Sequence, residues 1–334
     1  MSPLADLVFM YGSPAFAFLL IRLLLVIPVA QHEVTIGGSE PETILGFVMG
    51  SITFAHLLPV FLRSHLNPAI RRSHRWKLLI GPPAIVAILT VSPRMLILGG
   101  IIAAFWDVYH TGQQNFGLGR IYDSKAGVAN DATRRADRVI SHVLYIGPIL
   151  AGASLMDHVT ELDSFDQVGW KTLAKAPEYT SGHLVAVRIF AVAAMIVGVG
   201  WYLAAQRRLV HEGHPPSPHK VALMTISAVI QIVAWGFSSP LVAFTVVNLY
   251  HAVQYFALVW KSEGRRASTF LGVRRPSWSI PIGLVLVFVV PAMFGMAVSG
   301  VTTSSALINA SFLSVSLLHF WMDGFIWSVR KGTV

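Results

Sequence analysis

The chain has 334 residues, of which 54% are hydrophobic and only 12% are charged. A soluble domain carries about 25% charged residues, so the composition excludes an ordinary soluble protein and indicates an integral membrane protein. The net charge of +9 would favour nucleic-acid binding in a soluble protein. Here it is typical of basic loops beside a lipid bilayer, so we expect no nucleic-acid partner. The sequence has no cysteine, which excludes disulfides, iron–sulfur clusters and thiolate ligands.

Apolar stretches long enough to cross a bilayer recur along the whole chain without a linker. We therefore expect an all-α fold, a polytopic bundle of about ten transmembrane helices in a single membrane domain over residues 1–334. The ten expected spans are 13–30, 43–63, 78–92, 95–120, 138–156, 183–205, 219–237, 240–260, 278–298 and 304–328.

The segments between the expected spans alternate in charge. The basic segments follow every second span and cover residues 63–77, 120–138, 207–220, 261–275 and 330–331. The acidic segments follow the first and fifth spans and contain Glu33, Glu40, Glu42, Asp157, Glu161, Asp163 and Asp166. Because Lys and Arg concentrate on the cytoplasmic side, we expect both termini in the cytoplasm and the protein in a bacterial inner membrane.

Each of four spans that run toward the basic side carries one histidine at a similar depth. These histidines precede the basic residues that end their spans by 7, 10, 10 and 11 residues, and they are His56, His110, His251 and His319. At 1.5 Å per residue, the offsets differ by only about 6 Å. Polar side chains inside a membrane usually face the interior of a bundle, so we expect the four to converge.

Further polar residues share a helix face with these histidines. Asp107 and Gln114 lie three residues before and four after His110, and Asn248 and Tyr255 have the same spacing around His251. Asp323 follows His319 by one turn. Such carboxylates and amides orient metal-binding imidazoles.

Imidazole is the commonest protein ligand for iron, copper and zinc. We therefore predict His56, His110, His251 and His319 as metal ligands. Gln114, Asn248 and Asp323 would bind or orient the cofactor, Asp107 would act in catalysis, and Tyr255 would donate a hydrogen bond to the reacting oxygen. One or two Fe²⁺ ions would accept these histidines and leave room for O2.

Two other classes of protein remain open. A haem-binding electron-transfer protein would use two of the histidines as axial ligands. A transporter or proton-coupled carrier would use the same buried His and Asp cluster as a pathway. His142 would be a fifth member of the cluster. Arg22, a cation within the first span, would pair with Asp107 or Asp323 or extend to the membrane surface.

The histidine-containing segments resemble a known family. Residues 249–261, with His251, are similar to the histidine helix of the Brp/Blh-type membrane β-carotene dioxygenases, and Leu318-His319-Phe-Trp-Met-Asp323 is similar to their late His-x-x-x-Asp motif. His56 and His110 would stand for the two earlier motif histidines, whereas Tyr255 occupies the position of a second histidine in the family. The resemblance implies an all-helical membrane enzyme that uses iron and O2. We therefore expect a histidine-ligated iron oxygenase acting on a lipophilic substrate, a carotenoid or another lipid.

Overall fold

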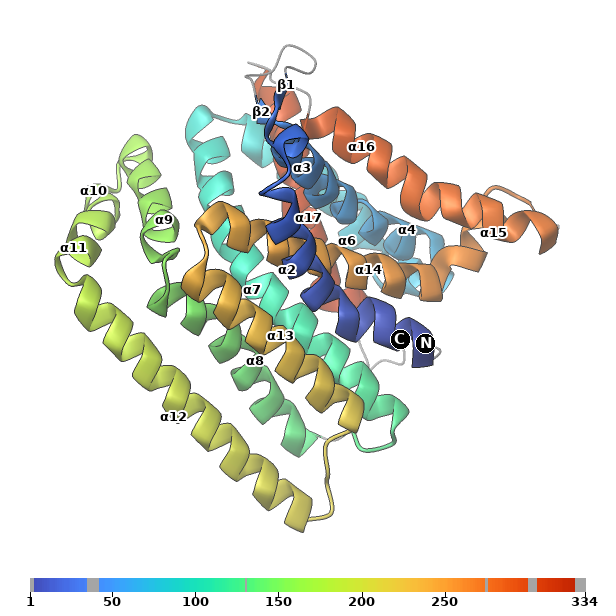
Figure 1. The fold of residues 1–334 in the computed structure, drawn as a ribbon. Coiled ribbons are helices and arrows are strands. Elements are labelled where there is room, and N and C mark those ends of the chain that lie inside the picture. The colour runs from blue at the N-terminus through green and yellow to red at the C-terminus, as the bar shows by residue number, and fades with distance from the viewer. Residues whose placement is uncertain (1–2, 35–41, 130, 274–275, 300–304, 328–334) are drawn as a thin grey trace. The chain divides into compact units, whose positions relative to one another are not determined.

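The computed structural model describes residues 3–34, 42–129, 131–273, 276–299 and 305–327. It is helical apart from one antiparallel pair of two-residue strands, so the predicted all-α class is confirmed (Figure 1). The chain forms two compact units. Unit 1 comprises Met1–Phe9, Leu19–Ala103 and Asn248–Val334, and unit 2 comprises Met10–Phe18 and Ala104–Val247. The single membrane domain remains a prediction, and each unit is described by itself.

Unit 1 contains both ends of the chain and the strand pair, in which Glu33 lies opposite Thr43. Its elements are α1 (Pro3–Ala5), η2 (Pro28–Gln31), β1 (Glu33–Val34), β2 (Glu42–Thr43), α3 (Ile44–Leu57), α4 (Pro59–Leu66), α5 (Pro68–Ser73), α6 (Arg75–Thr90), α15 (Pro276–Leu284), η4 (Val285–Val289), α16 (Val290–Ser299) and α17 (Ala306–Ile326). Four further elements begin in one unit and end in the other, namely η1 (Asp6–Tyr11), α2 (Gly12–Leu24), α7 (Pro93–Lys125) and α14 (Pro240–Phe270).

Unit 2 consists of helices alone in the part of the chain that the structure describes. Its own elements are α8 (Asp131–Ala151), α9 (Leu155–Thr160), η3 (Glu161–Val168), α10 (Lys171–Ala174), α11 (Ala176–Gly182), α12 (Leu184–His211) and α13 (Pro218–Phe237). The helices α12 and α13 both pack on α8. The chain bends by 95° between α8 and α9, where Gly152 lies so close to the Trp235 carbonyl oxygen that a Cβ would collide with it.

Seven helical segments among the described residues are long and apolar enough to cross a membrane, or eight if α8 with the α9 region is one bent span. They confirm an integral membrane protein, but the predicted count of ten spans is too high. Counted against eight spans, two expected spans account for the difference. The helix α6 has only 16 residues, below the roughly 20 that a bilayer core requires. The helix α17 is long enough at 21 residues, but polar side chains such as Asn309, His319 and Asp323 lower its hydropathy.

Three cations that the charge pattern places in loops are instead buried. Arg63, Arg120 and Lys220 are only 2%, 8% and 0% exposed. Their charges therefore do not mark solvated loops, which corrects part of the argument for alternating loop charge. The residues Glu40, Arg274, Arg275, Arg330 and Lys331 of that argument lie outside the described part of the chain.

The core of unit 1 gathers apolar side chains from α4, α5, α6, α14, η4 and α17. Its fully packed members are Val60, Ile70, Leu78, Tyr255, Val259, Val287, Leu318, Met322 and Ile326. Tyr255 brings the only polar group of this cluster, and burying a phenol requires a hydrogen-bond partner. The Tyr255 hydroxyl donates to Asp323 Oδ1, which lies beside the candidate site.

Candidate metal centre

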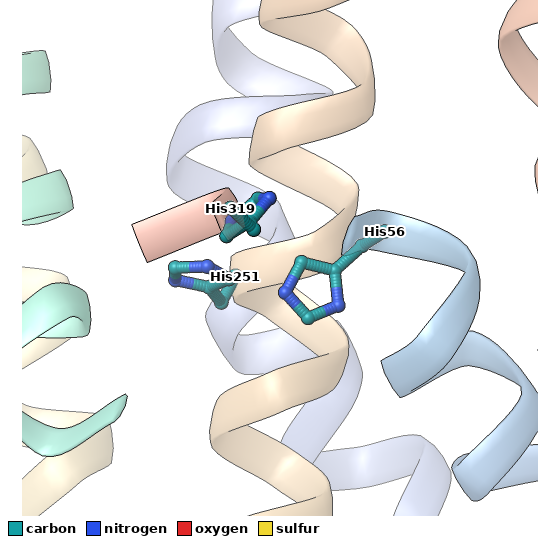
Figure 2. Close-up of side chains that lie close together, drawn as sticks. All are labelled: His56, His251 and His319. Atoms are coloured by element: carbon teal, nitrogen blue, oxygen red, sulfur yellow. The ribbon is translucent and has the colours of Figure 1, made fainter. Parts of the chain in front are cut away.

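Three of the predicted ligands meet in the interior of unit 1. His56 on α3, His251 on α14 and His319 on α17 each offer one ring nitrogen, and these three atoms all lie within 4.8 Å of one another. Figure 2 shows the three rings gathered together. The His56 ring stands nearly perpendicular to the other two, with centroid distances of 5.1 Å to His251 and 5.2 Å to His319. All three side chains are at most 2% exposed.

A proline break between α3 and α4 fixes the orientation of His319. Pro59 has no N–H and cannot continue the helix regularly, and the Phe61 amide donates to Leu58 O, three residues back. In a regular helix that amide would donate to Leu57 O. Here Leu57 O accepts a hydrogen bond from His319 Nδ1 at 3.3 Å. A carbonyl only accepts, so Nδ1 carries the proton and Nε2 presents its lone pair.

Asp323 lies beside that presented nitrogen. Its Oδ2 is 3.7 Å from His319 Nε2, while its Oδ1 accepts hydrogen bonds from the Tyr255 hydroxyl at 2.9 Å and from Trp327 Nε1 at 3.1 Å. One carboxylate oxygen is thus held by two donors, and the other lies beside His319. In this structure Leu57 O, rather than Asp323, holds the proton-bearing nitrogen of His319.

Arg63 lies on α4, which follows α3, and it bonds to α14 and α17. Its guanidinium donates to Glu263 Oε1 of α14 at 2.8 Å and to the Ile326 carbonyl of α17 at 3.5 Å, and it lies 3.8 Å from the centre of the Trp327 ring. Asn67 also donates to Glu263, at 3.3 Å. Sequence reasoning missed this set because Arg63 looked like a loop cation. The signal was its spacing, since Arg63 follows His56 by seven residues, about two helical turns.

The three nitrogens suit a single transition-metal ion. A nitrogen binds such an ion at about 2.0–2.1 Å, so neighbouring nitrogens of a tetrahedral site lie about 3.4 Å apart. The three nitrogens lie within 4.8 Å of one another, so the rings would move inward around a bound ion. The donor set of imidazoles with a neighbouring carboxylate is one that iron and zinc both accept.

The other predicted site residues divide between the two units. Asn248 is buried on α14 in unit 1, on the helix that carries His251. His110, Asp107 and Gln114 lie on the part of α7 that belongs to unit 2, where His110 is buried and the two others are half-buried. Their convergence with the three histidines of unit 1 remains a prediction.

The structure also shows the surroundings of His142 and Arg22, two residues whose roles the sequence left open. The His142 ring on α8 lies 5.0 Å from the Tyr109 ring, with Nε2 at 3.4 Å from the Gln113 amide nitrogen and Nδ1 donating to Arg138 O at 2.7 Å. Arg22 is exposed on α2. Neither the pairing of Arg22 with a carboxylate nor a ligand role for His142 is tested by these positions.

Unit 2 contains a buried cluster of a different kind. Lys220 Nζ donates to Asp123 Oδ2 at 2.8 Å and to both oxygens of Asp137 at 3.0 and 3.1 Å. Arg120 approaches the two carboxylates at 3.6 and 3.5 Å and donates to Thr133 at 2.7 Å. Two cations therefore balance two carboxylates where α7, α8 and α13 meet. We call this set the ion cluster of unit 2.

Comparison with known proteins adds no identification. No protein-family model matches the chain, and no curated protein and no solved structure shows significant similarity to it. The histidine centre and its surroundings are therefore interpreted from their own chemistry.

Proposed function

We propose that this chain is a membrane-embedded, histidine-ligated iron oxygenase that acts on a lipophilic substrate with O2. The observation that carries the proposal is the meeting of His56, His251 and His319, three buried imidazoles from three helices, with ligand atoms within 4.8 Å of one another. The segments around His251 and His319 resemble those of the Brp/Blh-type dioxygenases, which favours a carotenoid or a similar polyene as the substrate.

The surroundings of the three histidines favour iron over zinc. Open coordination positions beside a few histidines and a carboxylate are typical of non-haem iron oxygenases, and Asp323 Oδ2 at 3.7 Å from His319 Nε2 is at the spacing of two ligands that share one ion. When bound, iron would act as a Lewis acid and activate O2. The residues of this chain hold the ligands in place: Leu57 O fixes the His319 tautomer, and Tyr255 and Trp327 fix Asp323.

The apolar neighbours of the centre favour a lipophilic substrate. Tyr255 lies beside the ligands in space and Leu318 is next to His319 in sequence, and both belong to the apolar core of unit 1. The side chains that pack against this core are Phe256, Trp260, Phe288 and Trp321. Such a wall excludes water and accepts hydrocarbon. A lipophilic molecule would reach it laterally from the bilayer.

The decisive experiment measures metal and oxygen chemistry on the same sample. The full chain is purified anaerobically in detergent, its iron, zinc and copper are counted per chain, and O2 uptake is followed with β-carotene or a shorter polyene in micelles. We expect about one iron per chain and polyene-dependent O2 uptake with a cleaved or oxygenated product. His183→Ala, which alters an exposed histidine of unit 2, serves as the control and should change neither quantity.

Three outcomes would contradict the proposal. Zinc at one ion per chain without O2 uptake would indicate a hydrolytic or structural site. A strong Soret absorption band would identify a haem protein. No metal at all, after supplementation of the growth medium with iron, would favour a carrier that uses the histidines for protons.

We further propose that both termini face the cytoplasm across a bacterial inner membrane. The exposed basic residues after α4, which follow the second candidate span, support a cytoplasmic N-terminus. Reporter fusions at residues 1 and 334 test the proposal. The expected result is a cytoplasmic signal at both positions, and an external signal at either one would contradict it.

A further inference from the structure

We infer that unit 1 carries a binding site for the headgroups of anionic phospholipids at the junction of α5 and α6. We call residues 71–77 of this junction the basic elbow. The site lies outside the histidine centre and does not depend on the reaction proposed for it.

The basic elbow concentrates positive charge at the end of a membrane span. Four cations fall within seven residues, namely Arg71, Arg72, Arg75 and Lys77, and all four are exposed. The elbow follows directly on the candidate span Ile44–Leu66. Clusters of four or more Lys and Arg next to a transmembrane helix attract anionic lipids.

The cations of the elbow have no counter-charge among the residues that the structure describes. Within the part of the chain that the structure describes, no carboxylate lies within 4.0 Å of any of them. The buried cations of the same protein behave differently, since Arg63 pairs with Glu263 and Lys220 with Asp123. The protein thus neutralises its interior cations itself and leaves the charge of the elbow for an external anion.

The side chains around these cations locate the elbow at the boundary between headgroups and hydrocarbon. Trp76 is 59% exposed, with the Arg75 guanidinium 5.1 Å from its ring centre, and tryptophan is enriched at membrane interfaces. Leu79 and Ile80, beyond the buried Leu78, are also exposed. A change from cations through tryptophan to exposed aliphatic side chains within ten residues fits a lipid, which has a phosphate next to its acyl chains. A free phosphate ion has no acyl chain that would contact the exposed aliphatic side chains.

The elbow is held rigidly rather than as a loose loop. Asn67 caps α5 by accepting from the amides of Ala69 and Ile70, and Ile70 and Leu78 on either side of the elbow are buried in the core of unit 1. His74 and Lys77 both contact the Phe325 ring of α17, at 4.6 and 4.9 Å. A site fixed in this way loses little entropy when a headgroup binds.

The test uses Trp76 as a reporter in the full chain. The protein is reconstituted into vesicles of phosphatidylcholine that contain a minor fraction of acyl-brominated phosphatidylglycerol or, in parallel, of acyl-brominated phosphatidylcholine. Bromine quenches nearby tryptophan, and the difference between wild type and Trp76→Phe isolates the contribution of Trp76. We expect stronger quenching by the brominated phosphatidylglycerol. The same difference for the exposed Trp170, beside the acidic η3, should show no such preference.

Matched charge variants complete the test. Arg71→Gln/Arg72→Gln should lower the preference for phosphatidylglycerol by about fivefold per charge removed, whereas Arg207→Gln/Arg208→Gln, which removes two exposed charges at the end of α12, should leave it unchanged. Equal quenching of Trp76 by the two brominated lipids would overturn the inference. Loss of the preference with millimolar inorganic phosphate at constant ionic strength would show a phosphate site and would also overturn the assignment to lipid.

Discussion

The two units each bury a polar cluster among apolar helices, but the two clusters differ in composition. The ion cluster of unit 2 contains two cations and two carboxylates, and Lys220 alone makes three hydrogen bonds to Asp123 and Asp137. The centre of unit 1 gathers three imidazoles with one neighbouring carboxylate. One cluster is balanced in charge, and the other is rich in lone pairs.

This difference separates a structural role from a ligand-binding role. A buried charge is stable only when a partner compensates its desolvation, and the ion cluster does so with its own side chains while joining α7, α8 and α13. Neutral imidazoles do not compensate one another's charge in this way, and their lone pairs are ligands for a metal cation, which is the role proposed for them above. The predictions below test whether substitutions in the ion cluster lower folding stability while substitutions in the histidine centre remove metal.

The largest expected effect is the loss of metal on removal of a ligand. His251→Ala leaves two histidines at the centre, so metal per chain should fall to the background of the assay while the thermal unfolding temperature of the metal-free protein changes little. Elemental analysis and thermal scanning in detergent measure the two quantities. His158→Ala, in unit 2, is the control that should keep its metal. If His251→Ala retained full metal, the centre of unit 1 would not be the metal site.

The ion cluster should respond in the opposite way. Lys220→Met removes the cation that bonds both carboxylates and leaves two buried negative charges poorly compensated, at a cost of about 3–5 kcal/mol of folding stability. Lys125→Met removes an exposed cation from the end of α7 and should cost almost nothing. The measurement is the unfolding temperature of both variants in one detergent. Wild-type stability in Lys220→Met would refute the structural role.

A smaller effect is expected at Asp323. In Asp323→Asn the amide oxygen still accepts from Tyr255 and Trp327, so the fold is kept, but the charged oxygen beside His319 Nε2 is lost. Metal affinity or turnover should fall by about 10–100-fold, less than on removal of a histidine. Titration of the metal-free protein with Fe²⁺ measures the affinity. Unchanged affinity and turnover would show that Asp323 only satisfies a contact between helices.

The smallest expected effect concerns Tyr255. Tyr255→Phe removes one of the two donors to Asp323 Oδ1 and leaves Trp327 in place, which should lower stability by about 0.5–1.5 kcal/mol and keep the metal. Thermal scanning and elemental analysis of the same sample report both. Loss of the metal in this variant would show that Tyr255 contributes directly to the centre rather than through Asp323.

The sequence predicted the helical class correctly, and the ligand roles that it indicated for the histidines remain predictions. Apolar stretches of membrane-spanning length require helices, because backbone groups in lipid must be paired within their own segment. Matched spacing of His56, His251 and His319 from basic residues indicated a common depth, and the structure brings these three together. The count of spans was less reliable because it depended on helix ends, such as those of α6, which local apolarity does not define.

The sequence by itself determined which residues were too polar to face lipid, since composition and spacing are local properties of the chain. Only the tertiary structure decided what each polar residue does. Arg63 and Lys220 looked alike in sequence, as cations near the end of a span, with Arg71 as a third. Packing buries the first two beside carboxylates about two hundred and one hundred residues away in the chain and leaves the third exposed. The cost of burying an uncompensated charge depends on such distant partners, and no local pattern specifies them.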